Sequence, residues 1–169
     1  MSNANISPLA FVDPTTQLGD NVTIHPFAYI DKNVVIGDNC EIKPYASVLS
    51  GTRMGKNNRV FQNAVLGAEP QDFKYKGDET ILQIGDNNVI RENAVINRST
   101  FPDGRTIIGN GNFIHEGVHI SHDTQIGNSC VMGYGSKISG NCILEDCVIF
   151  GGNVLASQGS RVGAWSLIQ

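Results

Sequence analysis

Apolar residues recur at every sixth position of the chain, with polar residues and glycines between them. Of the 28 multiples of six from Ile6 to Ile168, 25 are apolar, and the exceptions are Asp72, Asp78 and Pro102. A six-residue period matches neither the 3.6-residue repeat of an α-helix nor the two-residue alternation of a half-buried strand. Repetition at a fixed short interval is typical of solenoids. The pattern therefore predicts short extended segments separated by tight corners, each with its apolar residue pointing inward.

Three such segments would complete one coil of eighteen residues, and successive coils would pair at about 4.8 Å. The position four residues after each inward residue is small in most hexads, as at Ala28, Cys40 and Ala46, and is predicted to face the axis too. We therefore predict an all-β parallel β-helix of about nine coils, in a single domain over residues 1–169.

Ten of the 19 glycines directly follow an inward residue, and there we expect corners that need a positive φ. These glycines are Gly19, Gly37, Gly55, Gly67, Gly85, Gly109, Gly127, Gly133, Gly151 and Gly163.

Two stretches leave the repeat, at about residues 69–80 and 97–105, and both are predicted to be loops ejected from the wall of the prism. Loops on a rigid scaffold often carry binding groups, although tolerated surface insertions are the alternative. The first loop mixes aromatic residues with polar ones, including Gln71, Asp72 and Lys74, which is unusual for a passive insertion.

Charge and composition narrow the possible functions. The net charge of −4 argues against a general nucleic-acid or membrane-surface binder, which needs a basic excess. The sequence contains no run of 18 apolar residues, which a membrane-spanning segment would need, and no recognisable secretory signal. We therefore expect a cytoplasmic protein. The four cysteines have no C-x-x-C spacing and are predicted to fill core space rather than to form disulfides or bind metal.

Three of the four histidines, His115, His119 and His122, lie within eight residues, and Asp123 follows them. Imidazole has a pKa near neutrality and suits a general base, and a neighbouring carboxylate would orient it. A zinc site is the competing interpretation. The β-helix carbonic anhydrases, however, take their histidines from widely separated positions, so we expect no metal.

Counting by eighteens places His122, Gly140 and Gln158 in one column along the prism. The backbone N–H of Gly140 could stabilise a developing oxyanion, because no side chain blocks the approach. A histidine base beside an oxyanion donor favours acyl transfer to a hydroxyl or an amine. No Ser or Cys is placed as a nucleophile, so direct transfer is the simpler mechanism.

Four segments then carry a more specific resemblance: QDFKYKG, IRENAVINRST, HISHD and GGNVLASQGSRVG. The repeat pattern resembles the hexapeptide-repeat family of left-handed β-helices. The four segments, in order along the chain, are similar to the bacterial UDP-N-acetylglucosamine O-acyltransferases of lipid A biosynthesis. That resemblance implies a left-handed β-helix that assembles as a homotrimer with active sites between subunits. It also implies transfer of a 3-hydroxyacyl chain from acyl carrier protein to the 3-hydroxyl of UDP-N-acetylglucosamine, with no cofactor.

The resemblance also implies residue roles. His122 matches the general base, Asp123 the carboxylate that orients it, and Gly140 the backbone donor to the thioester oxyanion. The matching substrate contacts are Gln71, Asp72, Lys74, His119, Asn141, Ser157 and Gln158.

Asn141 and Ser157 stand where the family has histidines, so contacts to the acyl chain or nucleotide are expected to differ. They leave open a related acyltransferase that acts on another nucleotide sugar at oxygen or nitrogen. The family continues beyond the position of Gln169 with more coils and a helical C-terminal domain. On that resemblance, the 169 residues alone are expected to have weak or no turnover, as in a non-catalytic shortened relative.

Overall fold

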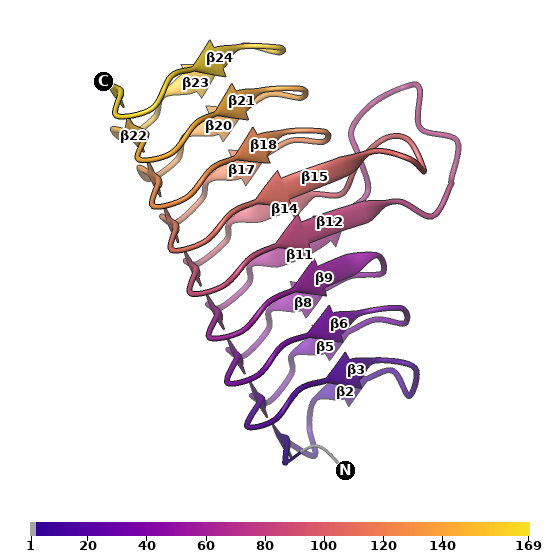
Figure 1. The fold of residues 1–169 in the computed structure, drawn as a ribbon. Helices are drawn as coiled ribbons and strands as arrows, with labels where there is room; N and C mark the ends of the chain where they lie inside the picture. Colours follow the sequence, from indigo (N-terminus) through magenta and orange to yellow (C-terminus); the bar gives the residue numbers. More distant parts are fainter. Residues whose placement is uncertain (1–2) are drawn as a thin grey trace.

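The computed structural model describes residues 3–169, and within that range every regular element is a short β-strand. The strands form three parallel sheets of nine, eight and eight strands, and consecutive strands always belong to different sheets. Figure 1 shows the coils stacked into a three-sided column, with the two termini at its opposite ends. The predicted left-handed parallel β-helix is confirmed. Residues 3–169 contain no helix with the length and apolar character of a membrane-spanning segment.

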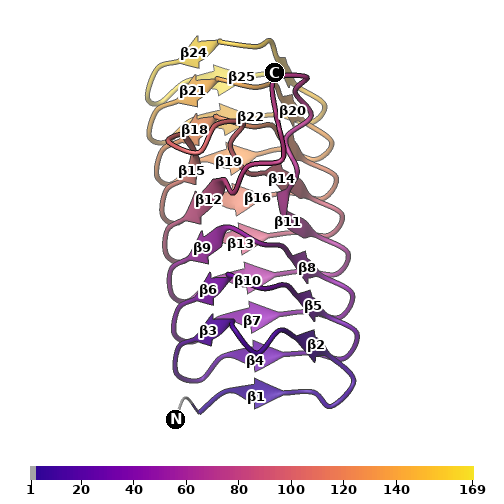
Figure 2. The ribbon, with the colours of Figure 1, turned by 90° about the vertical axis from the view of Figure 1, so that its right-hand side faces the viewer.

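Each sheet collects every third strand (Figure 2). The first sheet contains β1 (Asn5–Ile6), β4 (Thr23–Ile24), β7 (Glu41–Ile42), β10 (Arg59–Val60), β13 (Val89–Ile90), β16 (Phe113–Ile114), β19 (Val131–Met132), β22 (Ile149–Phe150) and β25 (Leu167–Ile168). The second contains β2 (Phe11–Val12), β5 (Tyr29–Ile30), β8 (Ser47–Val48), β11 (Val65–Ala68), β14 (Val95–Asn97), β17 (His119–Ile120), β20 (Lys137–Ile138) and β23 (Leu155–Ala156). The third contains β3 (Gln17–Leu18), β6 (Val35–Ile36), β9 (Thr52–Met54), β12 (Ile81–Ile84), β15 (Arg105–Ile108), β18 (Gln125–Ile126), β21 (Ile143–Leu144) and β24 (Arg161–Val162).

The strand register stacks the inward apolar residues on one another. Ile24 pairs with Ile42, a step of 18 residues. The step lengthens to 30 residues from Val60 to Ile90 and to 24 from Ile90 to Ile114, because the two ejected loops are inserted there. These side chains are almost completely buried and form one continuous core along the axis. Removal of this apolar surface from water is the main stabilising contribution to the column.

Three asparagine side chains lie at the second inward position, which holds a small residue in most hexads. Asn58, Asn88 and Asn112 are buried, and their amides continue the hydrogen bonding between coils. Asn58 Oδ1 accepts a hydrogen bond from the Asn88 N–H at 2.8 Å, and Asn88 Oδ1 accepts one from the Asn112 N–H at 2.9 Å. The ladder satisfies the buried amide oxygens and ties neighbouring coils together.

The prediction that glycines after inward residues have positive φ is wrong for nine of the ten; Gly67 alone has one, at 77°. The left-handed corner instead lies three residues after the inward position, for example at Asn21 (φ 57°) and Asn39 (φ 57°), because asparagine tolerates that conformation. Glycine is needed for a different reason, the close stacking of coils. A Cβ on Gly37 would lie 2.6 Å from the backbone carbon of Gly55.

Both predicted loops are present at the ridge between the second and third sheets (Figures 1 and 2). The first covers 69–80, between β11 and β12, as expected. The second is shorter than predicted and covers 98–104, because Asn97 ends β14 and Arg105 begins β15. The two loops therefore leave the same edge of consecutive coils and can reach a common site.

The stacking argument predicts that a methyl group at Gly109 destabilises the column, because its Cβ would lie 2.4 Å from the Gly127 carbonyl oxygen. Gly109→Ala should lower the free energy of unfolding by about 1–3 kcal/mol, the usual cost of overpacking. Gly163→Ala is the matched control, because Gly163 holds the same place in its hexad and a Cβ there meets nothing within 4 Å. Urea denaturation of both variants measures the difference. Equal midpoints for the two variants would contradict the stacking explanation.

Candidate active site

The candidate site lies on the ridge where strands of the second sheet end and the chain turns toward the third. His122 follows β17 there, and its side chain is only 8% exposed. Its Nδ1 lies 2.8 Å from Asp123 Oδ2 and 3.0 Å from Thr100 Oγ1. A carboxylate on Nδ1 holds the proton on that nitrogen and leaves Nε2 to accept one. The arrangement gives His122 the orientation that a general base requires.

Asp123 is itself held from several directions. It occupies the left-handed corner of its hexad, with a φ of 58°. Its backbone N–H donates to Thr106 Oγ1 at 2.8 Å, and its carboxylate accepts the Thr100 N–H at 3.2 and 3.3 Å. Backbone conformation and side-chain bonds thus set the position of the carboxylate before any ligand is present.

Gly140 lies against the His122 ring, one coil further along. A Cβ at position 140 would come within 2.5 Å of His122 Cε1 and 2.7 Å of its Nε2, so only glycine leaves room for the ring. The Asn141 N–H donates to the His122 carbonyl at 3.1 Å, and the Gly159 N–H donates to the Gly140 carbonyl at 3.0 Å. These bonds stack positions 122, 140 and 158 in successive coils. The Gly140 N–H itself donates no hydrogen bond to any group among residues 3–169.

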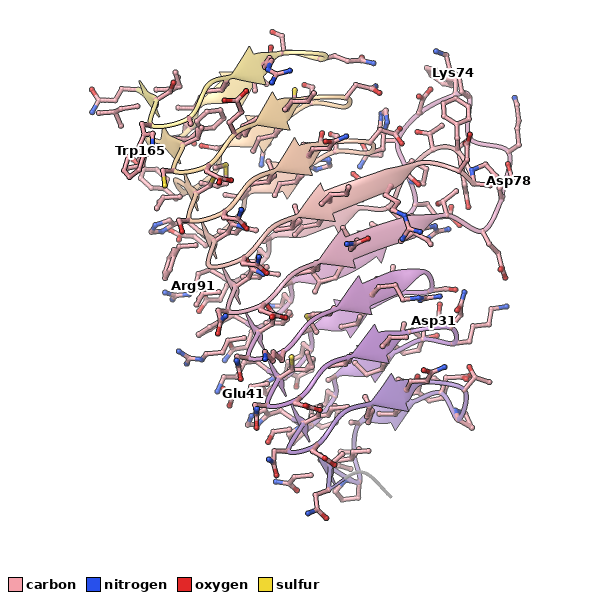
Figure 3. The ribbon with its side chains drawn as sticks, viewed as in Figure 1. Asp31, Glu41, Lys74, Asp78, Arg91 and Trp165 are labelled. Carbon is pink, nitrogen blue, oxygen red and sulfur yellow. The ribbon has the colours of Figure 1, made fainter. Side chains whose placement is uncertain are left out.

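The loop 69–80 brings Asp72 to the histidine. Asp72 Oδ2 lies 4.0 Å from His122 Nε2, on the opposite side of the ring from Asp123. Asp72 also organises its own turn, since its side chain accepts the Lys74 N–H at 3.0 Å and its carbonyl accepts the Tyr75 N–H at 3.0 Å. Lys74 is exposed and projects from the loop, away from the prism wall (Figure 3). Gln71 is exposed on the same loop.

Four further candidates, all among residues 3–169, make no side-chain hydrogen bond to the His122 ring. His119 is half-buried in β17, and burial, followed by the charge of nearby Lys137, lowers its pKa. The other three, Asn141, Ser157 and Gln158, are exposed on the next two coils.

His115 does not join the site, although it lies in the same short motif. It follows β16 in the first sheet, where its ring packs against Phe113 and its Nδ1 lies 3.7 Å from Glu116 Oε2. Among residues 3–169, no group of three or more His, Cys, Asp and Glu side chains is placed to hold a metal ion.

Sequence reasoning missed Thr100 and Thr106, which hold the His122–Asp123 pair, and it missed the contact that Arg98 makes with the loop 69–80. They lie outside the column that counting by eighteens predicts, because the loops shift the register there. The only available signal was the departure of both loops from the repeat at the same ridge.

Comparisons with known proteins agree with this fold. The family model described as "Bacterial transferase hexapeptide (six repeats)" matches residues 15–50 and 105–140. An acyl-[acyl-carrier-protein]–UDP-N-acetylglucosamine O-acyltransferase of Janthinobacterium sp. is 46% identical over 163 residues, which are 96% of this chain and 62% of that protein.

Two solved structures are also similar. The crystal structure of a UDP-N-acetylglucosamine acyltransferase from Bacteroides fragilis has a TM-score of 0.95 and 52% identity, covering 96% of this chain and 64% of that one. A UDP-N-acetylglucosamine acyltransferase from Campylobacter jejuni has a TM-score of 0.83 and 31% identity, covering 96% of this chain and 70% of that one. The chain thus spans less than two thirds of the length of the Janthinobacterium and Bacteroides proteins.

The contact between Gly140 and the His122 ring predicts that Gly140→Ala displaces the imidazole from Asp123. The backbone at Gly140 is not left-handed, so alanine adds a steric clash without backbone strain. A crystal structure of the variant should show the distance from His122 Nδ1 to Asp123 Oδ2 lengthened beyond hydrogen-bond range.

Gly152→Ala is the matched control, because its Cβ would meet the ring of Tyr134, which also lies 18 residues earlier. Tyr134 is exposed and can move, so His122 should stay in place in that variant. An unmoved His122 ring in Gly140→Ala would refute the steric role of Gly140.

Proposed function

The chain belongs to the UDP-N-acetylglucosamine O-acyltransferase family of hexapeptide-repeat transferases, and we propose that it transfers a 3-hydroxyacyl chain from acyl carrier protein to the 3-hydroxyl of UDP-N-acetylglucosamine. This reaction is the first step of lipid A biosynthesis. The observation that carries the proposal is the oriented histidine: His122 presents Nε2 to the ridge while Asp123 holds Nδ1. Because the acyl donor is already an activated thioester, the transfer needs no cofactor.

His122 acts as the general base. Its Nε2 takes the proton of the sugar 3-hydroxyl as the oxygen attacks the thioester carbonyl carbon. The imidazolium that forms is stabilised by the carboxylate of Asp123, which lies 2.8 Å from Nδ1. Direct attack of the sugar oxygen fits a site in which no serine or cysteine of residues 3–169 hydrogen-bonds to the His122 ring.

The backbone N–H of Gly140 receives the charge that develops on the carbonyl oxygen. Gly140 packs against the His122 ring, and its N–H has no acceptor among residues 3–169. An oriented backbone donor stabilises a tetrahedral oxyanion more than it stabilises the planar thioester. Collapse of the intermediate then breaks the carbon–sulfur bond, and the departing thiolate takes the proton from the His122 imidazolium.

The remaining candidates bind the two substrates. Asp72 faces His122 Nε2 at 4.0 Å, where it can accept a hydrogen bond from a sugar hydroxyl. Lys74 on the same loop offers a positive charge to the nucleotide diphosphate. His119 and Gln158 contact the nucleotide sugar, Gln71 lies beside the acyl chain, and Asn141 and Ser157 replace charged groups with neutral hydrogen-bonding ones.

The assembly that we propose is a homotrimer with each site between two subunits. The site residues lie on an external ridge, so a neighbouring prism can close the second wall of the site. Acyl carrier proteins are acidic and require a local basic surface at the entrance, although the whole chain is mildly acidic. The soluble substrates are consistent with a cytoplasmic location.

The proposal predicts that purified chain converts UDP-N-acetylglucosamine and 3-hydroxyacyl carrier protein to the 3-O-acylated sugar, at a measurable rate well below that of the full-length relatives. His122→Ala should lower kcat by about 100- to 10,000-fold, the usual contribution of a general base, because the hydroxyl proton loses the acceptor that Asp123 orients. Mass spectrometry of the nucleotide sugar product measures the turnover.

His115→Ala is the control, because His115 lies in the same motif but on another edge of the prism. It should retain the turnover of the unsubstituted chain. Unchanged product formation by His122→Ala, or no acylated sugar from the unsubstituted chain, would count against the proposed function.

A further inference from the structure

We propose that the segment Asn97–Thr100 is a positioning hub, in which Arg98 holds the substrate loop 69–80 and Thr100 holds the His122–Asp123 pair. The inference rests on the proposed function and extends it, since it assigns different kinetic roles to two residues that are nearly adjacent in sequence. Neither residue belongs to the hexad column that carries His122 and Gly140.

Arg98 is the main side-chain anchor of the substrate loop. Its side chain is only 11% exposed, and its guanidinium donates to the Gly67 carbonyl at 2.8 Å and to Tyr75 Oη at 2.8 Å. The guanidinium also lies 5.6 Å from the centre of the Tyr75 ring, within range of a cation–π interaction. The hydroxyl of Tyr75 donates in turn to the Asp78 carbonyl at 3.0 Å. One arginine thus fixes both the root of the loop and its middle.

The loop needs such an anchor because the space beneath it is hollow. A cavity of about 500 Å³ separates its second half from the preceding coil. Figure 3 shows Asp78 standing off the wall, with Asp31 on a coil nearer the N-terminus. Tyr75, Asp78 and Arg98 all line this cavity. A segment with few packing contacts has low local stability, so its position depends on the hydrogen bonds that hold it.

The neighbours of Arg98 fasten the two ends of the same loop. Asn97 Nδ2 donates to the Glu69 carbonyl at 2.6 Å, where the loop begins. The Ser99 N–H donates to the Ile81 carbonyl at 3.2 Å, just after the loop ends. The segment therefore forms hydrogen bonds at the start, in the middle and at the end of the loop that carries Asp72.

Thr100, unlike Arg98, contacts His122 and Asp123 rather than the loop 69–80. Its Oγ1 lies 3.0 Å from His122 Nδ1, and its backbone N–H donates to both carboxylate oxygens of Asp123. Thr100 is almost completely buried, so water does not replace its hydroxyl readily. With a proton on Nδ1, the hydroxyl oxygen is a second acceptor that holds the ring in the orientation with Nε2 free.

The two contacts predict separate kinetic effects. Freeing the loop displaces Asp72 and Lys74, which contact substrate, and should act mainly on binding. Removing the Thr100 hydroxyl leaves the loop in place and disturbs only the base, and should act mainly on the chemical step. Both residues are positioning residues, since each acts through another side chain.

The test compares Arg98→Met with Thr100→Val. Arg98→Met should raise KM for UDP-N-acetylglucosamine by about tenfold, with kcat within about twofold, because it removes charge-assisted bonds. Thr100→Val keeps the backbone N–H and the side-chain shape, and should lower kcat by about fivefold with KM within about twofold.

Conservative variants and a surface control separate positioning from general damage. Thr100→Ser keeps the hydroxyl and Arg98→Lys keeps the charge, and each should recover most of the lost parameter. Arg105→Met removes an exposed arginine at the far end of the second loop and should change neither parameter. If both test variants alter kcat and KM in the same proportion, or if the conservative variants recover nothing, the hub is refuted.

Two readouts do not depend on turnover. Hydrogen exchange of the amides at 72–78 should accelerate in Arg98→Met and not in Thr100→Val. The 15N shifts of the His122 ring should change in Thr100→Val and not in Arg98→Met. If the unsubstituted chain forms no acylated sugar, the proposed function fails. Hydrogen exchange and the ring shifts still test whether Arg98 positions the loop and Thr100 positions His122. If exchange and ring shifts are the same in both variants, the hub fails even when turnover is normal.

Discussion

The stacking of residues 18 apart is the constraint on which the rest of the structure depends. Each inward apolar residue packs on its counterpart in the next coil, as Ile24 does on Ile42, and the backbone pairs in parallel alongside. The close approach of coils explains why glycine follows so many inward residues, since a Cβ would overlap the adjacent backbone. The same stacking places Gly140 under the His122 ring. A repeat that builds the core therefore also aligns the functional ridge.

The site arises where the repeat is interrupted. A perfect prism would present only the ridge, with His122 held by Asp123 of its own corner. The two ejected loops add what the repeat lacks: Asp72 on the far side of the ring and Thr100 as a second partner of Nδ1. Because both loops leave the same edge of consecutive coils, they contact each other as well as the histidine. Scaffold and loops thus contribute different parts of one arrangement.

Much of the fold could be predicted from sequence because one physical rule, burial of every sixth residue, repeats along the chain. The column of His122, Gly140 and Gln158 followed from the same count. The glycine φ angles could not be predicted, since apolar periodicity does not show which corner position is left-handed. The positioning roles of Thr100 and Arg98 could not be predicted either, because their contacts depend on how two irregular loops fold against each other. The inward placement of asparagines such as Asn88 could not be predicted, because it depends on buried hydrogen bonds that only the structure shows.

The central claim is that His122 Nε2 is the atom that takes the proton of the attacking sugar hydroxyl. A crystal structure of the complex with UDP-N-acetylglucosamine tests this most directly. The account predicts the 3-hydroxyl oxygen within hydrogen-bond distance of His122 Nε2, about 2.6–3.2 Å, with Nδ1 still on Asp123. A sugar bound elsewhere, or one whose 3-hydroxyl faces away from the His122 ring, would contradict it.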